Sequence, residues 1–319
     1  MEVMKNRICY AFVSLCCALG LSQPVAAAQS DEWDSLSRET ITLYQQREYD
    51  RAAAVAKRAL ELAEREFGPE HPNVATSLNN LGLIYKTQGQ YAAAEPLYKR
   101  SLAISEKALG TNHPEVAASL NNLGALYYEQ GAYFAAELSY RRSLAIAETA
   151  LGPDHPNVAA PLNGLAALYA TQGRYPDAEA MYNRSVAIVA KALGPEHPNV
   201  AASLNNLAEL FQAQGQYAGA ELLYKRSLAI RENVFGPEHP AVAIALNNLA
   251  GLYLVQGQYA VAEPLYKRSL AISEKALGPD HPDVATVLEN MSRLYLETGK
   301  ADEAKKLVDR AAQIRAQKR

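Results

Sequence analysis

Histidine is the residue type in this chain with the clearest potential for chemistry, because an imidazole binds metal ions and transfers protons near neutral pH. The chain holds six histidines, each followed by proline and each 42 residues from the next: His71, His113, His155, His197, His239 and His281. A metal site needs several ligands within about 2 Å of one ion. A fixed period instead places one histidine in each repeat, and packed helices lie roughly 8–10 Å apart. We therefore expect a line of structural histidines rather than a metal site or a catalytic array.

The residues around each histidine predict what it does. In the segment "LGPEHP", Gly194 can adopt the left-handed conformation that closes a helix, and Pro195 prevents that helix from continuing. Pro198 suits the first position of the next helix, where its missing N–H costs nothing. The residue before a proline is held in the extended region that an N-cap residue occupies. We expect His197 to cap the next helix and to hydrogen-bond nearby backbone groups.

Asparagine is the second recurring polar residue. It stands at two adjacent positions of the repeat: Asn79, Asn80, Asn121, Asn122, Asn163, Asn205, Asn206, Asn247, Asn248 and Asn290. Asparagine is a poor helix former, so its repetition within a helix requires a reason. An amide donates and accepts, so it can pair with the backbone of an extended peptide whatever the peptide's side chains. One amide of each pair can equally bridge neighbouring repeats, and the sequence leaves both interpretations open.

Charged residues recur with the same period. Basic pairs stand at Lys57-Arg58, Lys99-Arg100, Arg141-Arg142, Lys225-Arg226 and Lys267-Arg268, and four of the pairs follow Glu95, Glu137, Glu221 and Glu263 by four residues. In a helix this order forms stabilising ion pairs. The pattern predicts a solvated face whose charges neutralise one another. A contact of the basic C-terminal run, which begins at Lys305, with acidic lipid or lipopolysaccharide is the weaker alternative.

These residues require helices to position them. In the second repeat, Val74, Leu78, Leu81 and Tyr85 lie at the spacing of one helix face, and a second apolar series follows Gly89. Each unit is therefore predicted to be a helical hairpin, with seven units starting near residues 31, 73, 115, 157, 199, 241 and 283. One hairpin cannot bury its apolar stripe alone, whereas stacked neighbours can. The sequence predicts an all-α solenoid.

The same positions carry a family resemblance, which covers about nine-tenths of the chain. The residues Leu78, Leu81, Gly82, Tyr85, Gly89, Tyr91, Ala94 and Tyr98 resemble the tetratricopeptide repeat. The linker "LGPEHPNVA" and the core "LNNL" are similar to the 42-residue repeats of kinesin light chains. The resemblance implies a right-handed superhelix whose concave groove binds a peptide or protein and which has no enzymatic activity. It also implies that the arc of Thr76, Asn79, Asn80, Leu83 and Thr87, with its equivalents, lines that groove.

Two repeats depart from the pattern. The first carries Thr40, Leu43 and Arg47 where the second has Gly82, Tyr85 and Gly89, which fits a terminal capping unit. The fourth carries Pro161 inside its first helix and Gly164 in place of the second asparagine. A proline there removes an i→i−4 hydrogen bond. We expect a distorted or late-starting first helix, a local bend of the superhelix and a gap in the groove lining.

The first residues predict export. Lys5 and Arg7 precede an apolar stretch at residues 8–21, and Ala26 and Ala28 follow in the pattern of a cleavage site. The apolar stretch is shorter than the roughly 20 residues that span a bilayer, which favours cleavage over a membrane anchor. We expect a signal peptide at residues 1–28, a repeat solenoid at residues 29–319, and a periplasmic or secreted protein without a membrane span.

Composition limits the chemistry of the mature chain. All three cysteines lie within residues 1–28, so the rest offers no disulfide or thiolate metal site. Removing Glu2, Lys5 and Arg7 from the 34 acidic and 31 basic residues leaves a net charge of −4, which argues against nucleic-acid binding. The sequence has no glycine-rich phosphate loop, nucleophile motif or dinucleotide fingerprint. We expect no enzymatic activity and no cofactor.

The function expected from these features is an exported scaffold that holds an extended peptide or protein segment. Two alternatives remain: an effector delivered to another cell, where it imitates a eukaryotic adaptor, and an architectural part of an envelope complex that uses its convex face or its ends. The sequence names no partner and sets no oligomeric state.

Overall fold

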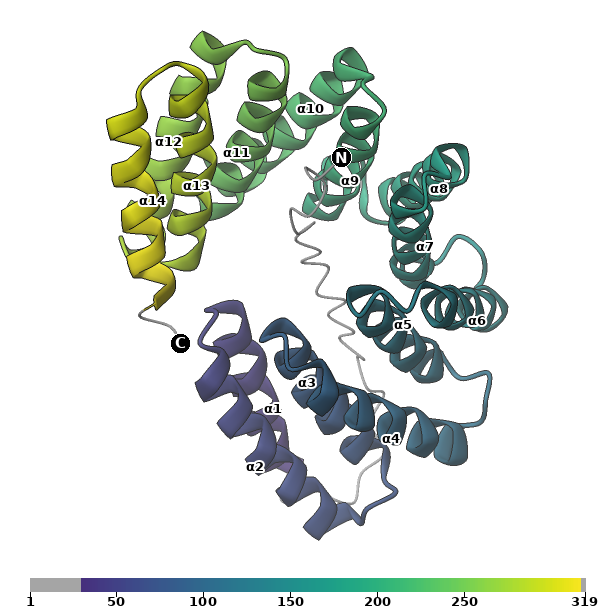
Figure 1. The fold of residues 1–319 in the computed structure, drawn as a ribbon. Coiled ribbons are helices and arrows are strands. Elements are labelled where there is room, and N and C mark those ends of the chain that lie inside the picture. The colour runs from purple at the N-terminus through teal and green to yellow at the C-terminus, as the bar shows by residue number, and fades with distance from the viewer. Residues whose placement is uncertain (1–29, 317–319) are drawn as a thin grey trace. The chain divides into compact units, whose positions relative to one another are not determined.

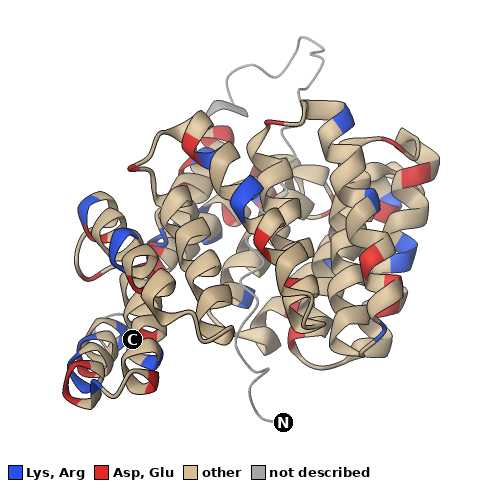
Figure 2. Ribbon diagram, turned by 90° about the horizontal axis from the view of Figure 1, so that it is seen from above, with Lys and Arg blue, Asp and Glu red and all other residues tan. Residues whose placement is uncertain are grey.

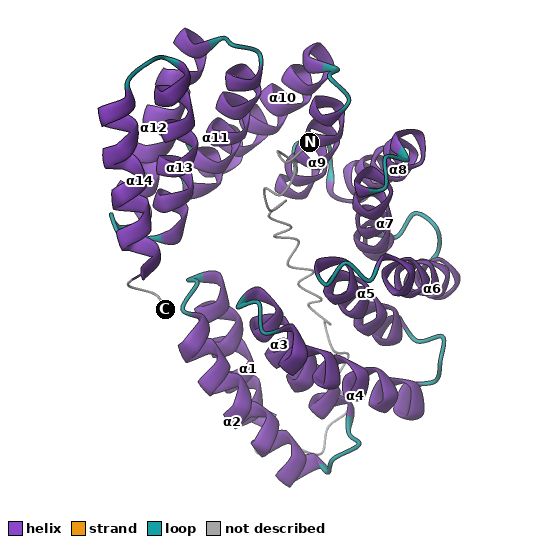
Figure 3. Cartoon of the chain, viewed as in Figure 1, coloured by secondary structure: helices purple, strands orange, loops and turns teal. Residues whose placement is uncertain are grey.

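The computed structural model describes residues 30–316, which contain fourteen α-helices, one short 3₁₀-helix and no strand (Figure 1, Figure 3). The first helices of the hairpins are α1 (Ser30–Gln45), α3 (Pro72–Thr87), α5 (Pro114–Glu129), α7 (Ala159–Thr171), α9 (Pro198–Ala213), α11 (Pro240–Val255) and α13 (Pro282–Glu297). The second helices are α2 (Tyr49–Phe67), α4 (Tyr91–Leu109), α6 (Tyr133–Leu151), α8 (Tyr175–Leu193), α10 (Tyr217–Phe235), α12 (Tyr259–Leu277) and α14 (Ala301–Ala316). The prediction of an all-α solenoid of about seven helical hairpins is confirmed. The expected signal peptide lies outside the described residues.

The chain divides after Leu168, within α7, into two compact units. In each unit a first helix packs on its own second helix, as α3 does on α4 and α11 on α12, and each second helix packs on the next first helix. First helices also contact one another, α1 with α3, α3 with α5, and α11 with α13. No two second helices of the described residues make a comparable contact. The first helices therefore form the tighter, inner layer of each unit.

Tyrosine and small residues build the core. In the second unit, Tyr224 of α10 and Tyr266 of α12 are buried in one cluster with Ala208, Leu249 and Ala250 of the first helices. In the first unit, a Cβ added at Gly82 would lie 2.8 Å from Cε1 of Tyr98. The small residue of the repeat thus provides the space that the tyrosine ring of the second helix fills.

The histidines lie in the linkers and cap the following helices, as the sequence predicts. At His71, His113, His155, His197, His239 and His281 the backbone is extended and Nδ1 accepts a hydrogen bond from the N–H two residues on, at 3.1–3.2 Å. Among the described residues, no group of three or more histidine, cysteine or acidic side chains could hold a metal ion. The imidazoles therefore cap the N-termini of the helices that follow them.

The glycine before each linker differs in detail from the expectation. Gly194 has φ 93° and ψ 150°, so φ is positive as predicted but ψ lies outside the left-handed helical region. That combination of angles is open to glycine almost alone. The Gly194 N–H closes α8 by donating to the Ala190 carbonyl. The chain then leaves the helix in an extended direction rather than curling back over its end.

The fourth repeat confirms the late-starting helix. Residues Pro156–Val158 form a 3₁₀ turn, and α7 begins only at Ala159, whereas α9 begins at the proline that follows its histidine. Pro161 has no N–H to donate to the Asn157 carbonyl, which explains the loss of the first α-helical turn. The predicted bend of the superhelix stays a prediction.

The expected gap at Gly164 is wrong, because the position is filled. A Cβ at Gly164 would lie 2.3 Å from Cε1 and 2.5 Å from Cζ of Tyr140. Gly164 therefore makes room for the ring of a buried tyrosine that comes from α6. Any larger residue at this position, the asparagine of the other repeats included, would require that ring to move.

Candidate functional site

The candidate site is the first-helix face, which we define as the positions of Thr76, Asn79, Asn80, Leu83 and Thr87 in α3 and their equivalents in the other first helices. At the Thr76 position this face is neutral, with Ala118, Ala160, Ala202, Ile244 and Thr286 in the later repeats. Asn163 and Asn205 are buried, and the other eight predicted asparagines are half-buried. These amides are therefore partly covered by neighbouring repeats and partly accessible.

In the second unit four of the asparagines form one hydrogen-bonded chain across three first helices. Asn290 of α13 donates to Oδ1 of Asn247 of α11 at 3.0 Å, and Asn247 donates to Asn248 at 3.4 Å. Asn248 donates to Oδ1 of Asn205 of α9 at 2.8 Å. Asn205 in turn donates to Oε1 of Glu209 at 2.7 Å. We call this chain of four amides and one carboxylate the amide relay.

Glu209 sets the direction of the amide relay. An ionised carboxylate only accepts hydrogen bonds, so Asn205 must turn its NH₂ group towards Glu209. The Asn205 carbonyl oxygen then faces Asn248, and the same requirement passes along the chain to Asn290. Burial raises the pKa of Glu209 to about 7, and the hydrogen bond from Asn205 offsets this only in part. The relay thus ends at a carboxyl group that titrates near neutral pH.

In the first unit the amides are less completely paired. Asn79 donates to Oγ of Ser119 at 3.0 Å, which bridges α3 and α5. Oδ1 of Asn79, Oδ1 of Asn121 and both amide atoms of Asn163 are buried without a hydrogen-bond partner. In the fourth repeat Pro161 stands at the position of Ser119 and Gly164 at that of Asn122, so Asn121 has neither of these side chains beside it.

The remaining second-position asparagines have no bridging role. Asn80 and Asn122 make no hydrogen bond to another described residue, and Nδ2 of Asn206 is buried without a partner. The structure therefore brings together Asn205, Asn247, Asn248 and Asn290, joins Asn79 to a serine instead, and leaves the others unpaired with one another. Both interpretations of the asparagines survive, since each bridging amide uses only part of its capacity.

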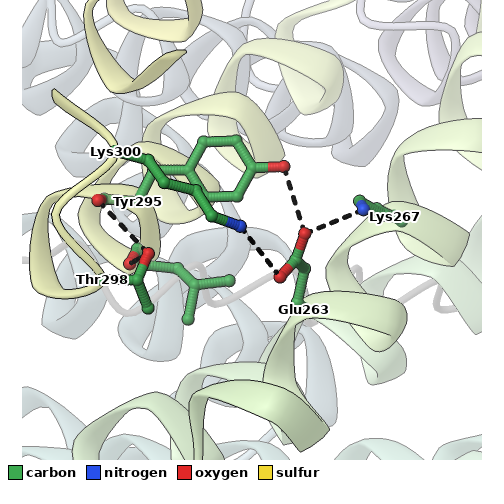
Figure 4. A network of polar contacts seen from close by, with 6 residues as sticks. Glu263, Lys267, Tyr295, Thr298 and Lys300 are labelled. Atoms are coloured by element: carbon green, nitrogen blue, oxygen red, sulfur yellow. Dashed lines mark hydrogen bonds and ion pairs between the residues drawn. The ribbon is translucent and has the colours of Figure 1, made fainter. Parts of the chain in front are cut away.

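The second-helix face is charged but paired, as predicted. Glu95, Glu137, Glu221 and Glu263 form ion pairs with the basic residue four positions later at 2.5–2.8 Å. Figure 4 shows Glu263 between Lys267 and Lys300, with the Tyr295 hydroxyl donating to it. In the ribbon of Figure 2, positions of acidic residues (red) and basic residues (blue) are interspersed along the helices. This face is internally neutralised.

Sequence reasoning missed two sets of repeated residues that join elements. Buried serines of the second helices donate to a first-helix carbonyl 26 residues earlier, as Ser101 does to Ala75 and Ser227 to Ala201. The second basic residue of several pairs reaches the preceding repeat, as Arg268 does to Glu232 at 2.8 Å. Both sets recur every 42 residues, so the period itself was the available signal. Glu209 is not repeated and gave no such signal.

The fold and the repeated first-helix face define a helical-hairpin solenoid of the kind that presents a binding surface. The tetratricopeptide repeat family matches residues 41–107, 85–149, 115–191, 159–233, 223–272 and 242–317, and the chain belongs to this family. No curated protein matches the sequence. None of the described helices combines the length and the apolar character needed to cross a membrane.

Solved structures with the same fold include kinesin light chain-like proteins. BtubC (BKLC) from P. vanneervenii is 27% identical, with a TM-score of 0.57 over 72% of this chain and 91% of that one. A Podosopora anserina structure of nearly identical TPR-like repeats, described as of kinesin light chain type, is 32% identical, with a TM-score of 0.53 over 65% and 98%. The Rap conjugation regulator of plasmid pLS20, in complex with the Phr* peptide, is 17% identical, with a TM-score of 0.66 over 91% and 75%.

Proposed function

We propose that this protein is an exported, non-enzymatic scaffold that holds an extended segment of a partner protein against its first-helix face. The observation that carries the proposal is the succession of half-buried amides on this face. Asn205, Asn247 and Asn248 each use one N–H and one oxygen lone pair within the relay and keep a second of each, while Asn290 uses one N–H. An extended segment presents alternating N–H and C=O groups, which such amides can pair with regardless of side chain.

The family supports this proposal at the level of the fold. Tetratricopeptide repeat proteins are generally scaffolds that bind proteins or peptides. The pLS20 Rap regulator, which shares the fold alone, was solved with a peptide bound. The absence of charge at the Thr76 positions argues against a surface that selects its partner by a row of like charges.

Site-specific photo-crosslinking in producing cells tests the proposal. A photoreactive phenylalanine replaces Ala202 on the first-helix face of α9 or, as the matched control, the exposed Ala260 of the second helix α12. We expect Ala202 to capture a partner protein that mass spectrometry identifies and Ala260 to capture none. Capture from Ala260 alone would place binding on the other face and overturn the proposal.

Export is tested separately on the purified protein. If residues 1–28 are a cleaved signal peptide, N-terminal sequencing of the exported protein should begin at Gln29. Recovery of an intact Met1 in the membrane fraction would contradict cleavage. Fractionation of a producer culture, grown with recipient cells, then distinguishes a periplasmic or secreted scaffold from an effector. Only the effector should be found inside the recipient cells.

An architectural role has one specific observation in its favour. Phe134 and Leu138 lie one turn apart on α6 and are 85% and 62% exposed, while the positions equivalent to Phe134 in α4 and α10 hold Ala92 and Ala218. Exposed neighbouring apolar side chains favour protein contacts. The photoreactive phenylalanine placed at Phe134 tests this role, since an envelope component captured there and not at Ala202 would favour it.

A further inference from the structure

Glu209 lacks the ion pair that other glutamates of its unit form. In the second helices Glu221 pairs with Lys225 at 2.5 Å, Glu232 with Arg268 at 2.8 Å and Glu263 with Lys267 at 2.8 Å. Glu209 is half-buried on the first-helix face, and no described residue forms an ion pair with it. Its Oε1 accepts from Asn205, and no described residue donates to its Oε2. One carboxylate oxygen is therefore left for a partner.

The neighbours of Glu209 do not neutralise it. On α9 the residues one turn after it are Gln212 and Ala213, and the equivalent position of α11 is Gly251. From α10, the Tyr224 hydroxyl donates to Gln212 at 3.2 Å, and burial together with the charge of Glu209 raises the pKa of Tyr224. A Cβ at Gly251 would meet only the Tyr266 hydroxyl, at 3.6 Å. Glu209 thus faces neutral groups and a position without a side chain. The charge of Arg293 in α13, at the same register beyond Gly251, acts on the pKa of Tyr266 and is not a cause of the pKa shift of Glu209.

A cation is the partner that this arrangement fits. Asn205 already supplies a neutral donor, and burying the carboxylate further under a bound segment is costly unless the charge is compensated. A second neutral donor would leave that charge uncompensated, whereas an ammonium or a guanidinium donates and carries the opposite charge. The raised pKa of Glu209 is what a partly buried carboxyl group without a cation should have.

We propose that Glu209 receives the side chain of a lysine or arginine in the bound segment and so selects for a basic residue at one position of it. This inference rests on the proposed function and adds a specificity to it. The amides of the relay bind backbone without regard to sequence, and Glu209 at the end of the relay fixes the register of the segment. The chain thereby accepts varied side chains along most of the bound segment but requires a positive charge at one position of it.

Peptide selection tests the inference. A library of random 12-residue peptides with blocked N-termini is selected on the full chain, on Glu209→Gln and on the control Glu263→Gln, which removes the same charge from the second-helix face. We expect a basic residue at one position of the peptides selected by the wild type and by Glu263→Gln, and no such preference with Glu209→Gln.

Affinities of a selected peptide give the quantitative test. Replacing its basic residue by norleucine should weaken binding at least tenfold for the wild type and for Glu263→Gln, and less than twofold for Glu209→Gln. Equal losses in the wild type and Glu209→Gln, or selected peptides without a shared basic position, would overturn the inference and leave the proposed function intact. If no peptide is enriched over an unrelated immobilised protein, the proposed function itself fails, and the inference with it.

Discussion

A single ring nitrogen explains why histidine recurs in every linker. Nδ1 of His197 accepts from the Asn199 N–H at 3.1 Å, the bond that a serine or aspartate side chain usually supplies at a helix start. Because Nδ1 is the acceptor, the proton of the neutral ring is on Nε2. The ring also adds an apolar surface, as in the stacking of His239 on Phe235 at 4.5 Å. Capping and packing thus come from one residue.

The capping role predicts a difference between two substitutions. His197→Ala removes the acceptor and should lower the free energy of unfolding by about 0.5–2 kcal/mol, whereas His197→Asn keeps an acceptor at the same place and should lose less. Urea unfolding followed by circular dichroism measures both. Equal losses for alanine and asparagine would show that ring packing, and not the hydrogen bond, is the contribution of His197.

The raised pKa of Glu209 predicts a stability effect with a definite sign. Its carboxyl group has a pKa of about 7 in the folded chain against 4.5 as the reference value, so the folded state disfavours the ionised form. The associated loss of stability is absent below pH 4.5 and grows as the pH rises to about 7. Glu209→Gln should therefore stabilise the chain by about 1–3 kcal/mol at pH 8 and have little effect at pH 4.

Thermal melts at the two pH values measure this effect, and Glu263→Gln provides a control of opposite sign. The hydrogen bond from Lys267 lowers the pKa of Glu263, so that carboxylate contributes stability above its unfolded pKa. Glu263→Gln should lose stability at pH 8. If Glu209→Gln were destabilising at pH 8, the carboxylate would already have a stabilising partner in the folded chain. It would then not be available to bind a cation of a partner.

At the scale of the elements, the start of α7 was predictable and the packing around it was not. The missing N–H of Pro161 is visible in the sequence, and the late start at Ala159 follows from it directly. The role of Gly164 depends on the ring of Tyr140, which comes from another helix. Periodicity indicates which residues face the core, but not which side chain of a neighbouring element enters a given space.

Pro161 predicts a stabilising substitution. Pro161→Ser restores the N–H, and the new hydroxyl can accept a hydrogen bond from Nδ2 of Asn121, as Ser119 does from Asn79. We expect helicity to rise and the free energy of unfolding to increase by about 1–3 kcal/mol. Circular dichroism and thermal melts measure both quantities. Pro161→Ala restores the N–H alone, so the difference between the two variants isolates the bond to Asn121. No gain in either variant would mean that the 3₁₀ turn has another cause.

At the scale of the whole molecule, the 42-residue repeat made the fold predictable but drew attention away from residues that occur in one repeat only. Hairpins, linkers and the neutralised second-helix face all recur every 42 residues, so each was supported several times over. The amide relay was only half predictable, because its asparagines are periodic but the acceptor that orients them occurs once. The positions equivalent to Glu209 hold isoleucine, leucine, alanine, alanine, glycine and arginine, which an averaged repeat hides. The single departures from the repeat carry the specific features of this chain.

The two uses of asparagine predict that substitutions at the unpaired positions and at the relay positions differ in their effect on stability. One triple variant replaces Asn80, Asn122 and Asn206 by alanine; the first two make no hydrogen bond to another described residue, and the third has a buried Nδ2 without a partner. The other replaces Asn205, Asn247 and Asn290, which form the amide relay with Asn248. Each net hydrogen bond contributes about 0.5–1.5 kcal/mol, so three lost contacts to a partner should weaken binding roughly tenfold to a thousandfold.

We expect the first variant to lose binding without a lower melting temperature, since alanine favours the helix. The second should melt at a lower temperature, because it loses bonds between repeats, and its folded fraction should also bind more weakly, because the relay amides keep a donor and an acceptor for the partner. Calorimetric titration with a selected peptide and thermal melts distinguish the two variants. Unchanged affinity in the first variant would show that the unpaired amides do not contact the partner, and would move the binding surface away from the first-helix face.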